Sequence, residues 1–471
     1  MDSAAFFDFD RTLLAGSSGP YIAEHLREHG LGPDQDVPGA SMAIAAFDRF
    51  GETPISAALA RASVKASKGW STSAVKAAAK SVAPVLDDLI LPFARLEIEK
   101  HRLAGRRVAI ATTSPHHLLK PLAKRLGVSL IATRWLSEDD IYTGEVDGTF
   151  GWGRGKLALV KAWSAEHNID LSRSYAYSDA MSDSPLLAAV GHPTAVNPDP
   201  ALSAMARLQR WPIRWFDVPP GVVKIGGKEL QDWFRPLATP AAFPYVDIDI
   251  AGLENIPSTG GAIVAFNHRS YFDASVVGMA IARSGRAARG LGKKEVFDAP
   301  IIGSMMRAVG GIRVDRGTGS DEPLRAAEDV LRGGELIMLA PEGTIPRGPA
   351  FFEPKLKGRW GAARLAAATG VPVIPMGLWG TENVWPRSQR LPNMAPRERP
   401  SVTVTVGQPL HLAGDDPQID TDAIMDALIQ LLPAVARTER TPTEEELLRT
   451  FPPGYTGDPT KEVDRRPGSD T

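Results

Sequence analysis

Short apolar runs alternate with longer amphipathic stretches through the second half of this chain. A continuous apolar run bounded by turn residues is typical of a strand that is buried on both faces. We predict such strands at residues 262–266, 311–314, 336–340, 373–377 and 402–406. Helical stretches separate them, at residues 274–283, 322–332, 358–368 and 422–437. This alternation predicts an α/β domain with a largely parallel sheet over about residues 246–440.

The first part of the chain, residues 1–205, carries a second set of strands and a large helical insertion. Apolar runs at residues 4–7, 108–111 and 174–177 each end at polar residues. Between the first two runs, residues 17–91 are rich in alanine and are predicted to form helices. This pattern predicts a separate α/β domain that is interrupted after its first strand.

The joint between the two domains, residues 206–245, mixes aromatic and basic side chains with proline and glycine pairs. Indole rings beside cations suit a membrane interface, but aromatic residues at a domain joint also serve as ordinary packing, so both interpretations stay open. Residues 441–471 combine mixed charge with several prolines. We predict that they form a disordered tail, apart from a short helix around residues 444–450.

Composition narrows the setting in which this protein works. The chain has 471 residues and no cysteine, so it contains no disulfide. Its formal net charge of -2 creates no overall electrostatic field that would attract nucleic acid. No signal peptide is apparent, and no apolar stretch reaches the roughly 18 residues of a spanning helix. We therefore expect a cytoplasmic protein that meets lipid, if it handles lipid, peripherally at the inner face of the cell membrane.

Acidic, hydroxyl and lysine side chains follow the predicted strands of the first domain. Asp8 and Asp10 come directly after the first strand, where a period of two puts them on one side of the chain. Carboxylates crowded in this way need a hard cation. The polar residues that follow at later positions are Thr112, Lys156, Asp179 and Asp183. Together they are the parts of a magnesium-dependent phosphoryl-transfer site, although an ordinary acidic turn is the alternative for the first pair.

In their order these segments resemble the four motifs of the haloacid dehalogenase superfamily, in particular its phosphoserine-phosphatase-like branch. The resemblance implies a Rossmann-like domain whose helical insertion is a cap. It implies that Asp8 is the nucleophile, that Asp10 is the general acid and base, and that Thr112 and Lys156 hold the phosphate. The carboxylates that it places around Mg²⁺ are Asp8, Asp10, Asp179 and Asp183. Arg11 stands where glycine is common in that superfamily, which is expected to narrow the pocket.

The second domain carries its candidate chemistry in the turn after the strand at residues 262–266. His268 and Asp273 lie in this turn, just before a predicted helix. An imidazole can take a proton from an alcohol, and a carboxylate at a helix start can hold the ring in the required tautomer. No serine or cysteine motif accompanies them, so we predict that a substrate hydroxyl itself attacks an acyl donor. Taken alone, the spacing also fits a histidine that caps the helix.

Three later blocks, at residues 310–316, 341–344 and 371–375, follow this turn in order. The whole set resembles the glycerolphosphate and lysophosphatidate acyltransferase family over about residues 245–410. The resemblance implies that His268 is the general base and that Asp273 is its partner. The residues predicted to bind substrate are Asn267, Arg316, Glu342, Gly343 and Thr344.

One position departs from the family pattern. The family usually continues Glu-Gly-Thr with arginine, whereas Ile345 stands here, followed by Pro346 and Arg347. Either Arg347 replaces that cation, or the phosphate of the acceptor is held less firmly. The departure affects the identity of the acceptor more than the chemistry.

Combined, these features predict a two-domain enzyme of phospholipid metabolism. The second domain is expected to move a fatty acyl group from acyl-CoA or acyl carrier protein to 1-acylglycerol 3-phosphate, with backbone donors near Gly343 at the oxyanion. The first is expected to hydrolyse a phosphomonoester with Mg²⁺. Two alternatives stay open: a phosphatase whose second domain only binds lipid, and an acyltransferase whose first domain is a non-catalytic module.

Overall fold

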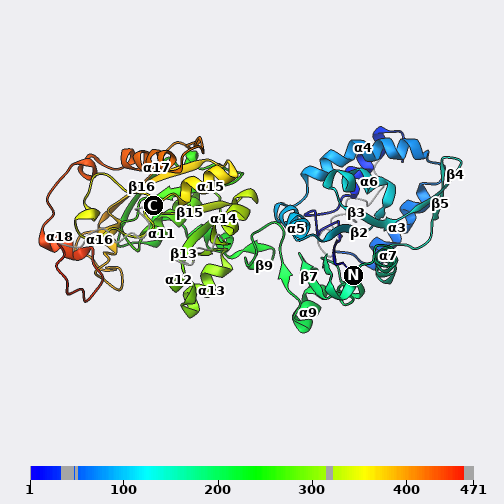
Figure 1. The fold of residues 1–471 in the computed structure, drawn as a ribbon, viewed down its shortest axis with the longest axis horizontal. Coiled ribbons are helices and arrows are strands. Elements are labelled where there is room, and N and C mark those ends of the chain that lie inside the picture. Colours follow the sequence, from blue (N-terminus) through cyan, green and yellow to red (C-terminus); the bar gives the residue numbers. More distant parts are fainter. Residues whose placement is uncertain (1, 33–46, 48–50, 315–321, 461–471) are drawn as a thin grey trace. The chain divides into compact units, whose positions relative to one another are not determined.

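The structure, a computed structural model, describes residues 2–32, 47, 51–314 and 322–460. The chain divides into two compact units, Met1–Pro220 and Gly221–Thr471, each of which is described by itself (Figure 1). Both are α/β units, as the sequence predicts. In the parts of the chain that the structure describes, no helix is both long enough and apolar enough to cross a membrane.

Unit 1 is built on a parallel sheet with β1 near its centre. Its strands, in spatial order, are β3 (Ser129–Thr133), β2 (Arg107–Pro115), β1 (Ala4–Phe7), β6 (Tyr175–Ser178), β7 (His192–Val196) and β8 (Ile213–Arg214). Phe6 and Phe7 alternate between the two faces and are completely buried in separate cores. Because the strands are parallel, the residues that follow β1, β2 and β6 meet at one edge of the sheet.

The helices of unit 1 cover the sheet and form the predicted cap. The cap helices are α1 (Gly19–Glu28), α3 (Pro54–Ala66) and α4 (Thr72–Asp88), and those of the core are α5 (Pro92–Leu103), α6 (His116–Leu126), α7 (Arg154–Glu166), α8 (Ser184–Leu187) and α9 (Pro200–Gln209). A hairpin of β4 (Trp135–Glu138) and β5 (Ile141–Val146) joins the cap. The N–H of Gly69 donates to Tyr142 O at 2.9 Å, which fastens the hairpin to the end of α3. We did not predict this hairpin.

Unit 2 contains a mixed sheet that is parallel except at one pair. Its strands, in spatial order, are β11 (Asp247–Ala251), β17 (Ser401–Val406), β16 (Val373–Trp379), β12 (Ala262–Phe266), β15 (Leu336–Leu339), β13 (Ala288–Lys293) and β14 (Ile312–Val314). Within this sheet, β16 and β17 are the only described neighbours that pair antiparallel. All five predicted strands are present. Two further strands were not predicted: β11, an edge strand with alternating aspartates, and β13, which contains glycines.

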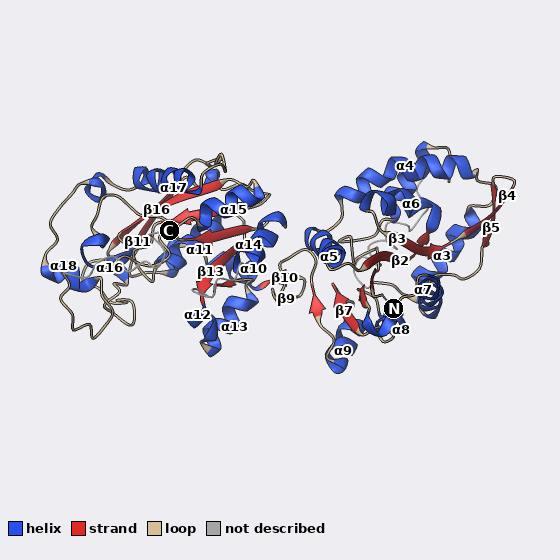
Figure 2. Ribbon diagram, in the orientation of Figure 1, coloured by secondary structure: helices blue, strands red, loops and turns tan. Residues whose placement is uncertain are grey.

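Helices lie on both faces of the sheet of unit 2 (Figure 2). On β12, Val264 packs with α11 (Asp273–Arg283), whereas Ile263 packs with α14 (Glu322–Arg332), α15 (Gly361–Thr369) and α17 (Pro417–Leu431). A strand buried on both faces is fixed in its direction and depth. The turn that follows β12 is therefore held from both sides.

The predicted linker, residues 206–245, is not a separate segment. Its first part belongs to unit 1, where β8 pairs with β7 and Phe216 is completely buried. Its second part belongs to unit 2, where the fully buried Arg289 forms an ion pair with Glu229 at 2.6 Å. The boundary between the two units therefore falls after Pro220, within the predicted linker. The residues before it pair with a strand of unit 1, and the residues after it form an ion pair in unit 2.

The predicted disordered tail is ordered for most of its length. Helix α18 (Glu444–Arg449) confirms the predicted short helix, and Phe451 after it is 1% exposed. Thr450 Oγ1 accepts a hydrogen bond from Gly348 N at 2.8 Å. The mixed charge and the prolines suggested disorder, but these buried contacts hold the segment on unit 2. Residues 461–471 lie outside the described residues.

Candidate active sites

The edge of the sheet in unit 1 gathers buried carboxylates around one lysine. Asp8 follows β1, and Asp183 follows β6 on a short 3-10 turn. Lys156, at the start of α7, places Nζ 2.9 Å from Asp8 Oδ1 and 2.6 Å from Asp183 Oδ2. Burial lowers the pKa of Lys156, but the carboxylates of Asp183 and Asp8 outweigh it and hold that pKa well above its usual value. The lysine is therefore a fixed cation beside Asp8, as a phosphate group requires.

Asp10 is held at the same edge by hydrogen bonds to both of its oxygens. Oδ1 accepts from Ser18 N at 2.5 Å, and Oδ2 accepts from Ser114 Oγ at 3.2 Å. Burial raises the pKa of Asp10, while the hydrogen bonds from Ser18 oppose this shift. A carboxyl group that retains its proton more readily suits a general acid.

Thr112, predicted to hold phosphate, is buried, and its hydroxyl accepts a hydrogen bond from Ser114 N at 3.1 Å. The hydroxyls that reach the acidic groups belong to the next two residues. Thr113 Oγ1 donates to Glu52 Oε1 at 3.3 Å, and Ser114 reaches Asp10. The sequence did not single out these two hydroxyls, because it does not show that the register of β2 shifts between Thr112 and Pro115. The role of Thr112 in holding phosphate stays a prediction.

Asp179, predicted as a magnesium ligand, is held by the residues that follow Asp10. Arg11 Nε donates to Asp179 Oδ2 at 2.8 Å, and Thr12 Oγ1 donates to Oδ1 at 3.2 Å. Burial raises the pKa of Asp179 to about 7, with the charge of Arg11 opposing it. Arg11 has a φ of 59°, a conformation that glycine adopts at less cost, which gives a physical reason for glycine at this position in related sequences.

The kinds of ligand in this cluster fit Mg²⁺, although their present arrangement is not that of a metal site. Asp8, Asp179 and Asp183 offer carboxylate oxygens, and Asp183 Oδ1 is buried without a hydrogen-bond partner among the described residues. Across the described ranges, no group of acidic or histidine side chains is arranged to hold a metal ion. Asp8, Asp179 and Asp183 would hold Mg²⁺ once Arg11 releases Asp179. Asp10, also predicted as a ligand, is held by Ser18 and Ser114 through its two oxygens.

Glu52 from the cap also reaches this site, and the sequence analysis did not identify it. Its Oε2 accepts from Ser182 Oγ at 2.5 Å, and its Oε1 accepts from Thr113 Oγ1. Burial raises the pKa of Glu52, and the charge of Lys156 opposes this shift. No motif marks Glu52, because it lies far from the other site residues in sequence and only the folding of the cap brings it close.

In unit 2, the turn after β12 brings His268 and Asp273 together. His268 Nδ1 lies 2.7 Å from Asp273 Oδ2. The same oxygen accepts the N–H groups of Arg269 and Ser270, at 2.7 and 2.8 Å. Asp273 is completely buried at the start of α11, whereas the His268 side chain is 27% exposed. Because Asp273 is an acceptor, His268 carries its proton on Nδ1 and leaves Nε2 able to accept another.

Two further residues position this turn, although both were predicted to bind substrate. Glu342 is buried, and its Oε2 accepts from His268 N at 2.5 Å. Asn267 is also buried, and its amide exchanges two hydrogen bonds with the backbone of Leu378, at 2.9 and 2.7 Å. The structure therefore corrects the prediction for Asn267, because its side chain ties β12 to β16. Its place in the motif suggested a substrate contact, since a sequence does not show which backbone groups lie opposite.

The predicted oxyanion donor near Gly343 has another partner. Gly343 N donates to Ala340 O at 2.9 Å, within the tight turn that requires its φ of 72°. Thr344 is partly exposed after this turn. Arg316, the remaining residue predicted to bind substrate, lies outside the described residues.

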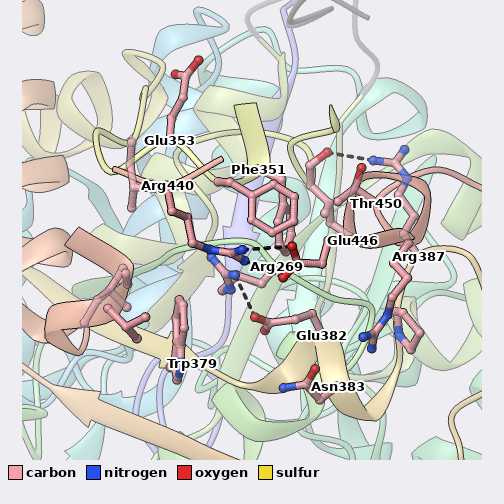
Figure 3. A pocket seen from close by; sticks show the side chains of 18 of the residues that line it. Arg269, Phe351, Glu353, Trp379, Glu382, Asn383, Arg387, Arg440, Glu446 and Thr450 are labelled. Atoms are coloured by element: carbon pink, nitrogen blue, oxygen red, sulfur yellow. Dashed lines mark hydrogen bonds and ion pairs between the residues drawn. The ribbon is translucent and has the colours of Figure 1, made fainter. Parts of the chain in front are cut away.

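A cavity of about 240 Å³ lies beside this turn. Arg269 reaches into it, with its guanidinium 4.4 Å from the ring centres of both Phe351 and Trp379 and 2.7 Å from Glu382 Oε1 (Figure 3). Sandwiching between two rings fixes the plane of the guanidinium. Sequence reasoning missed Arg269, although it stands directly after the candidate base.

The same cavity contains the position where the family pattern has arginine. Ile345 is buried there, and Arg387 Nη1 donates to its carbonyl at 2.7 Å. Arg440 and Glu446 pair at 2.9 Å on another wall, so the C-terminal helix α18 contributes to the cavity (Figure 3). Arg387, from a later part of the chain, therefore places its guanidinium beside Ile345, the position where the family pattern has arginine.

Both units match known protein families. The family model described as haloacid dehalogenase-like hydrolase matches residues 5–188, and the one described as acyltransferase matches residues 247–379. The chain is 38% identical over 224 residues to the "inhibition of morphological differentiation protein" of Streptomyces azureus, covering 46% of this chain and 79% of that protein. It therefore belongs to the haloacid dehalogenase-like hydrolases, and it carries a fused acyltransferase domain.

Two further proteins are similar to part of this chain. A phosphoserine phosphatase of Mycobacterium tuberculosis is 32% identical over 230 residues, which cover 48% of this chain and 75% of that protein. Among solved structures, the 1-acyl-sn-glycerophosphate acyltransferase PlsC from Thermotoga maritima matches with 23% identity and a TM-score of 0.35, covering 43% of this chain and 77% of that one.

Proposed function

We propose that unit 2 transfers a fatty acyl group from a thioester, either acyl-CoA or acyl carrier protein, to the free hydroxyl of 1-acyl-sn-glycerol 3-phosphate. The pairing of His268 with Asp273 carries this proposal. Asp273 is buried and held by two backbone N–H groups, so the position and direction of its carboxyl group are fixed before substrate arrives. His268 is exposed enough to meet a substrate hydroxyl through Nε2.

In this reaction His268 first accepts a proton and then donates it. His268 Nε2 takes the hydroxyl proton as the oxygen attacks the thioester carbonyl, and the C–S bond then breaks. The leaving thiolate receives that proton from the imidazolium. Asp273 stabilises the imidazolium and keeps the ring in one orientation. The hydroxyl itself is the nucleophile, so no serine or cysteine of the chain is consumed.

The phosphate of the acceptor is proposed to lie in the cavity of Figure 3. Arg269 and Arg387 both line it, and a planar guanidinium matches phosphate oxygens better than an ammonium does. Arg387 supplies a cation near Ile345, where the family pattern has arginine on the turn itself. Substrate of this kind would be met at the inner face of the cell membrane, and the exposed side chains of Trp233 and Phe234 are suited to that surface.

Unit 1 is proposed to hydrolyse a phosphomonoester. Asp8 attacks phosphorus and forms an acyl phosphate, while Asp10 protonates the leaving oxygen and then activates the water that releases phosphate. Lys156 neutralises charge beside Asp8 throughout. When bound, Mg²⁺ adds further positive charge at the phosphate, held by Asp8, Asp179 and Asp183.

The test uses purified protein, Mg²⁺, labelled 1-acylglycerol 3-phosphate and a long-chain acyl-CoA, with the wild type compared against His268→Ala and Asp8→Asn. Phosphatidate formation that is lost only in the His268 variant supports the acyltransferase. Phosphate release that is lost only in the Asp8 variant supports the phosphatase. Equal acylation by His268→Ala would refute the first assignment and favour a lipid-binding role for unit 2.

A further inference from the structure

Unit 1 contains a second cavity, between its cap and its sheet, which opens on the catalytic edge. It has a volume of about 440 Å³, and Asp10, Ser18, Thr113 and Ser114 lie on its wall. Ser18 and Ser114 are the residues that hold the two oxygens of Asp10. Protein interiors rarely contain spaces much larger than a water molecule, whereas this volume is typical of a ligand site. A group that leaves from the phosphate would therefore extend into this cavity.

The wall of the cavity is mostly apolar away from the catalytic end. Side chains of the cap and of the core share it, among them Ile22, Leu26, Val64, Trp70, Leu118 and Trp135. All of them belong to the main hydrophobic core of unit 1 or pack against it. Apolar ligand surface transferred from water into such a space is stabilised roughly in proportion to its area.

The charges on the wall are confined to one end. Among the lining residues that the structure describes, only Asp10 and Glu52 carry charge, and both lie at the catalytic cluster. Arginine, lysine and histidine are absent from that described wall. A small polar phosphate such as phosphoserine carries its own carboxylate, for which the described wall offers no cation. Burying an ionised carboxylate without a partner costs more than the roughly 2–7 kcal/mol of an uncharged polar group, so the described wall disfavours such a substrate.

We infer that unit 1 hydrolyses phosphomonoesters whose alcohol carries an acyl or alkyl chain, with the chain lying in this cavity. The phosphate meets Asp8 and Lys156, the polar part of the alcohol meets the serine and threonine hydroxyls at the mouth, and the chain extends between α1 and α3. This inference rests on the proposed phosphatase activity and adds its substrate class. It also places both units on lipid phosphates.

The experiment measures phosphate release by the full chain with Mg²⁺ and without any acyl donor. The substrates are glycerol 3-phosphate, phosphoserine and 1-acylglycerol 3-phosphates of increasing chain length, kept below the concentration at which they aggregate. The inference predicts that kcat/KM rises by up to about fourfold for each added methylene until the cavity is filled. Equal kcat/KM for all chain lengths, or a preference for phosphoserine, would overturn it.

Two substitutions on helix α3, one inside the cavity and one outside it, test whether the acyl or alkyl chain lies in the cavity. Ala60 lines the cavity, whereas Ala62 on the same helix is exposed and does not. Ala60→Phe fills the cavity and should abolish the gain with chain length while leaving glycerol 3-phosphate hydrolysis within about twofold. Ala62→Phe should behave as the wild type. If Ala60→Phe lowers hydrolysis of both substrates equally, the chain does not lie there.

A binding measurement separates this inference from the proposed activity. Calorimetry with decylphosphonate, which cannot be hydrolysed at its C–P bond, should show binding to the wild type and to Asp8→Asn, and binding weakened by tenfold or more in Ala60→Phe. If no phosphate ester is hydrolysed but this pattern holds, the phosphatase proposal fails and the cavity assignment stands. If glycerol 3-phosphate is hydrolysed and decylphosphonate does not bind, the cavity assignment alone fails.

Discussion

Arg11 Nε lies 2.8 Å from Asp179 Oδ2, so the residue that stands in place of a common glycine is paired with a predicted magnesium ligand. Arg11 and Asp179 are both largely buried, and a buried carboxylate deprived of its partner is strongly destabilised. The arginine therefore satisfies Asp179 when no cation is present. A cation that binds Asp179 competes with the arginine for this carboxylate.

Removing this arginine should strengthen magnesium binding. If the ion pair keeps the site closed in most molecules, Arg11→Gly should bind Mg²⁺ about tenfold more tightly, as measured by calorimetry on metal-free protein. Glycine also relieves the positive φ at this position. Arg11→Lys is the control, because it keeps the charge, and its affinity should stay near that of the wild type. Weaker binding by Arg11→Gly would show that the arginine supports the cation site.

Asp273 should be essential to acyl transfer and unnecessary for phosphate release. In Asp273→Asn an amide N–H can face His268 Nδ1 and reverse the tautomer, so acylation should fall by about 10²- to 10⁴-fold. The surface variant Asp247→Asn provides the matched control. A fall of less than tenfold, in protein with unchanged circular dichroism, would mean that His268 does not act as the base.

Asn267 should matter for stability. Asn267→Ala leaves the buried N–H and C=O of Leu378 without the partners they have at 2.7 and 2.9 Å. The free energy of unfolding of unit 2 should fall by about 3 kcal/mol, as followed in urea. The exposed Asn383 offers a control, since Asn383→Ala should change that free energy by less than about 0.5 kcal/mol. A loss of activity without any loss of stability would restore the predicted substrate contact.

Unit 1 should lose stability in weak acid through His101. Its Nε2 lies 2.8 Å from Tyr177 Oη, and its side chain is 2% exposed. Burial lowers the pKa of His101 to about 4, with Glu97 opposing the shift. Below the ordinary pKa of about 6.5 the unfolded chain takes up a proton that the folded protein does not, so stability is lost as pH falls toward about 4.

The size of that loss is about 3 kcal/mol at most. It is measured as the difference in urea unfolding of unit 1 between pH 7 and pH 4. His101→Gln stays neutral, so its unfolding free energy should fall less over the same range. Parallel pH curves for the two proteins would show that other groups carry the acid sensitivity.

The sequence by itself determined the architecture of the two domains and the positions of their candidate catalytic residues. Apolar runs such as residues 262–266 predict strands because they are too short for a typical helix and are apolar on both faces, as a strand buried on both sides is. Polar residues directly after such runs lie at the carboxyl end of their strand, as Asp8 does after β1 in unit 1 and His268 does after β12 in unit 2. These are local patterns, and the fused haloacid dehalogenase-like and acyltransferase domains follow from their order.

Only the tertiary structure shows which groups these side chains contact. Asn267 finds the backbone of Leu378, Glu52 reaches the catalytic edge from the cap, and Arg387 reaches Ile345 from a later turn. Each contact joins groups that are distant in sequence, so no spacing predicts it. The same holds for the apolar cavity of unit 1, whose walls come from helices and strands that meet only when the cap folds over the sheet. The pattern of apolar and polar residues along the chain indicates which residues are buried. The contacts between side chains and the shape of a cavity depend on which surfaces face each other in space.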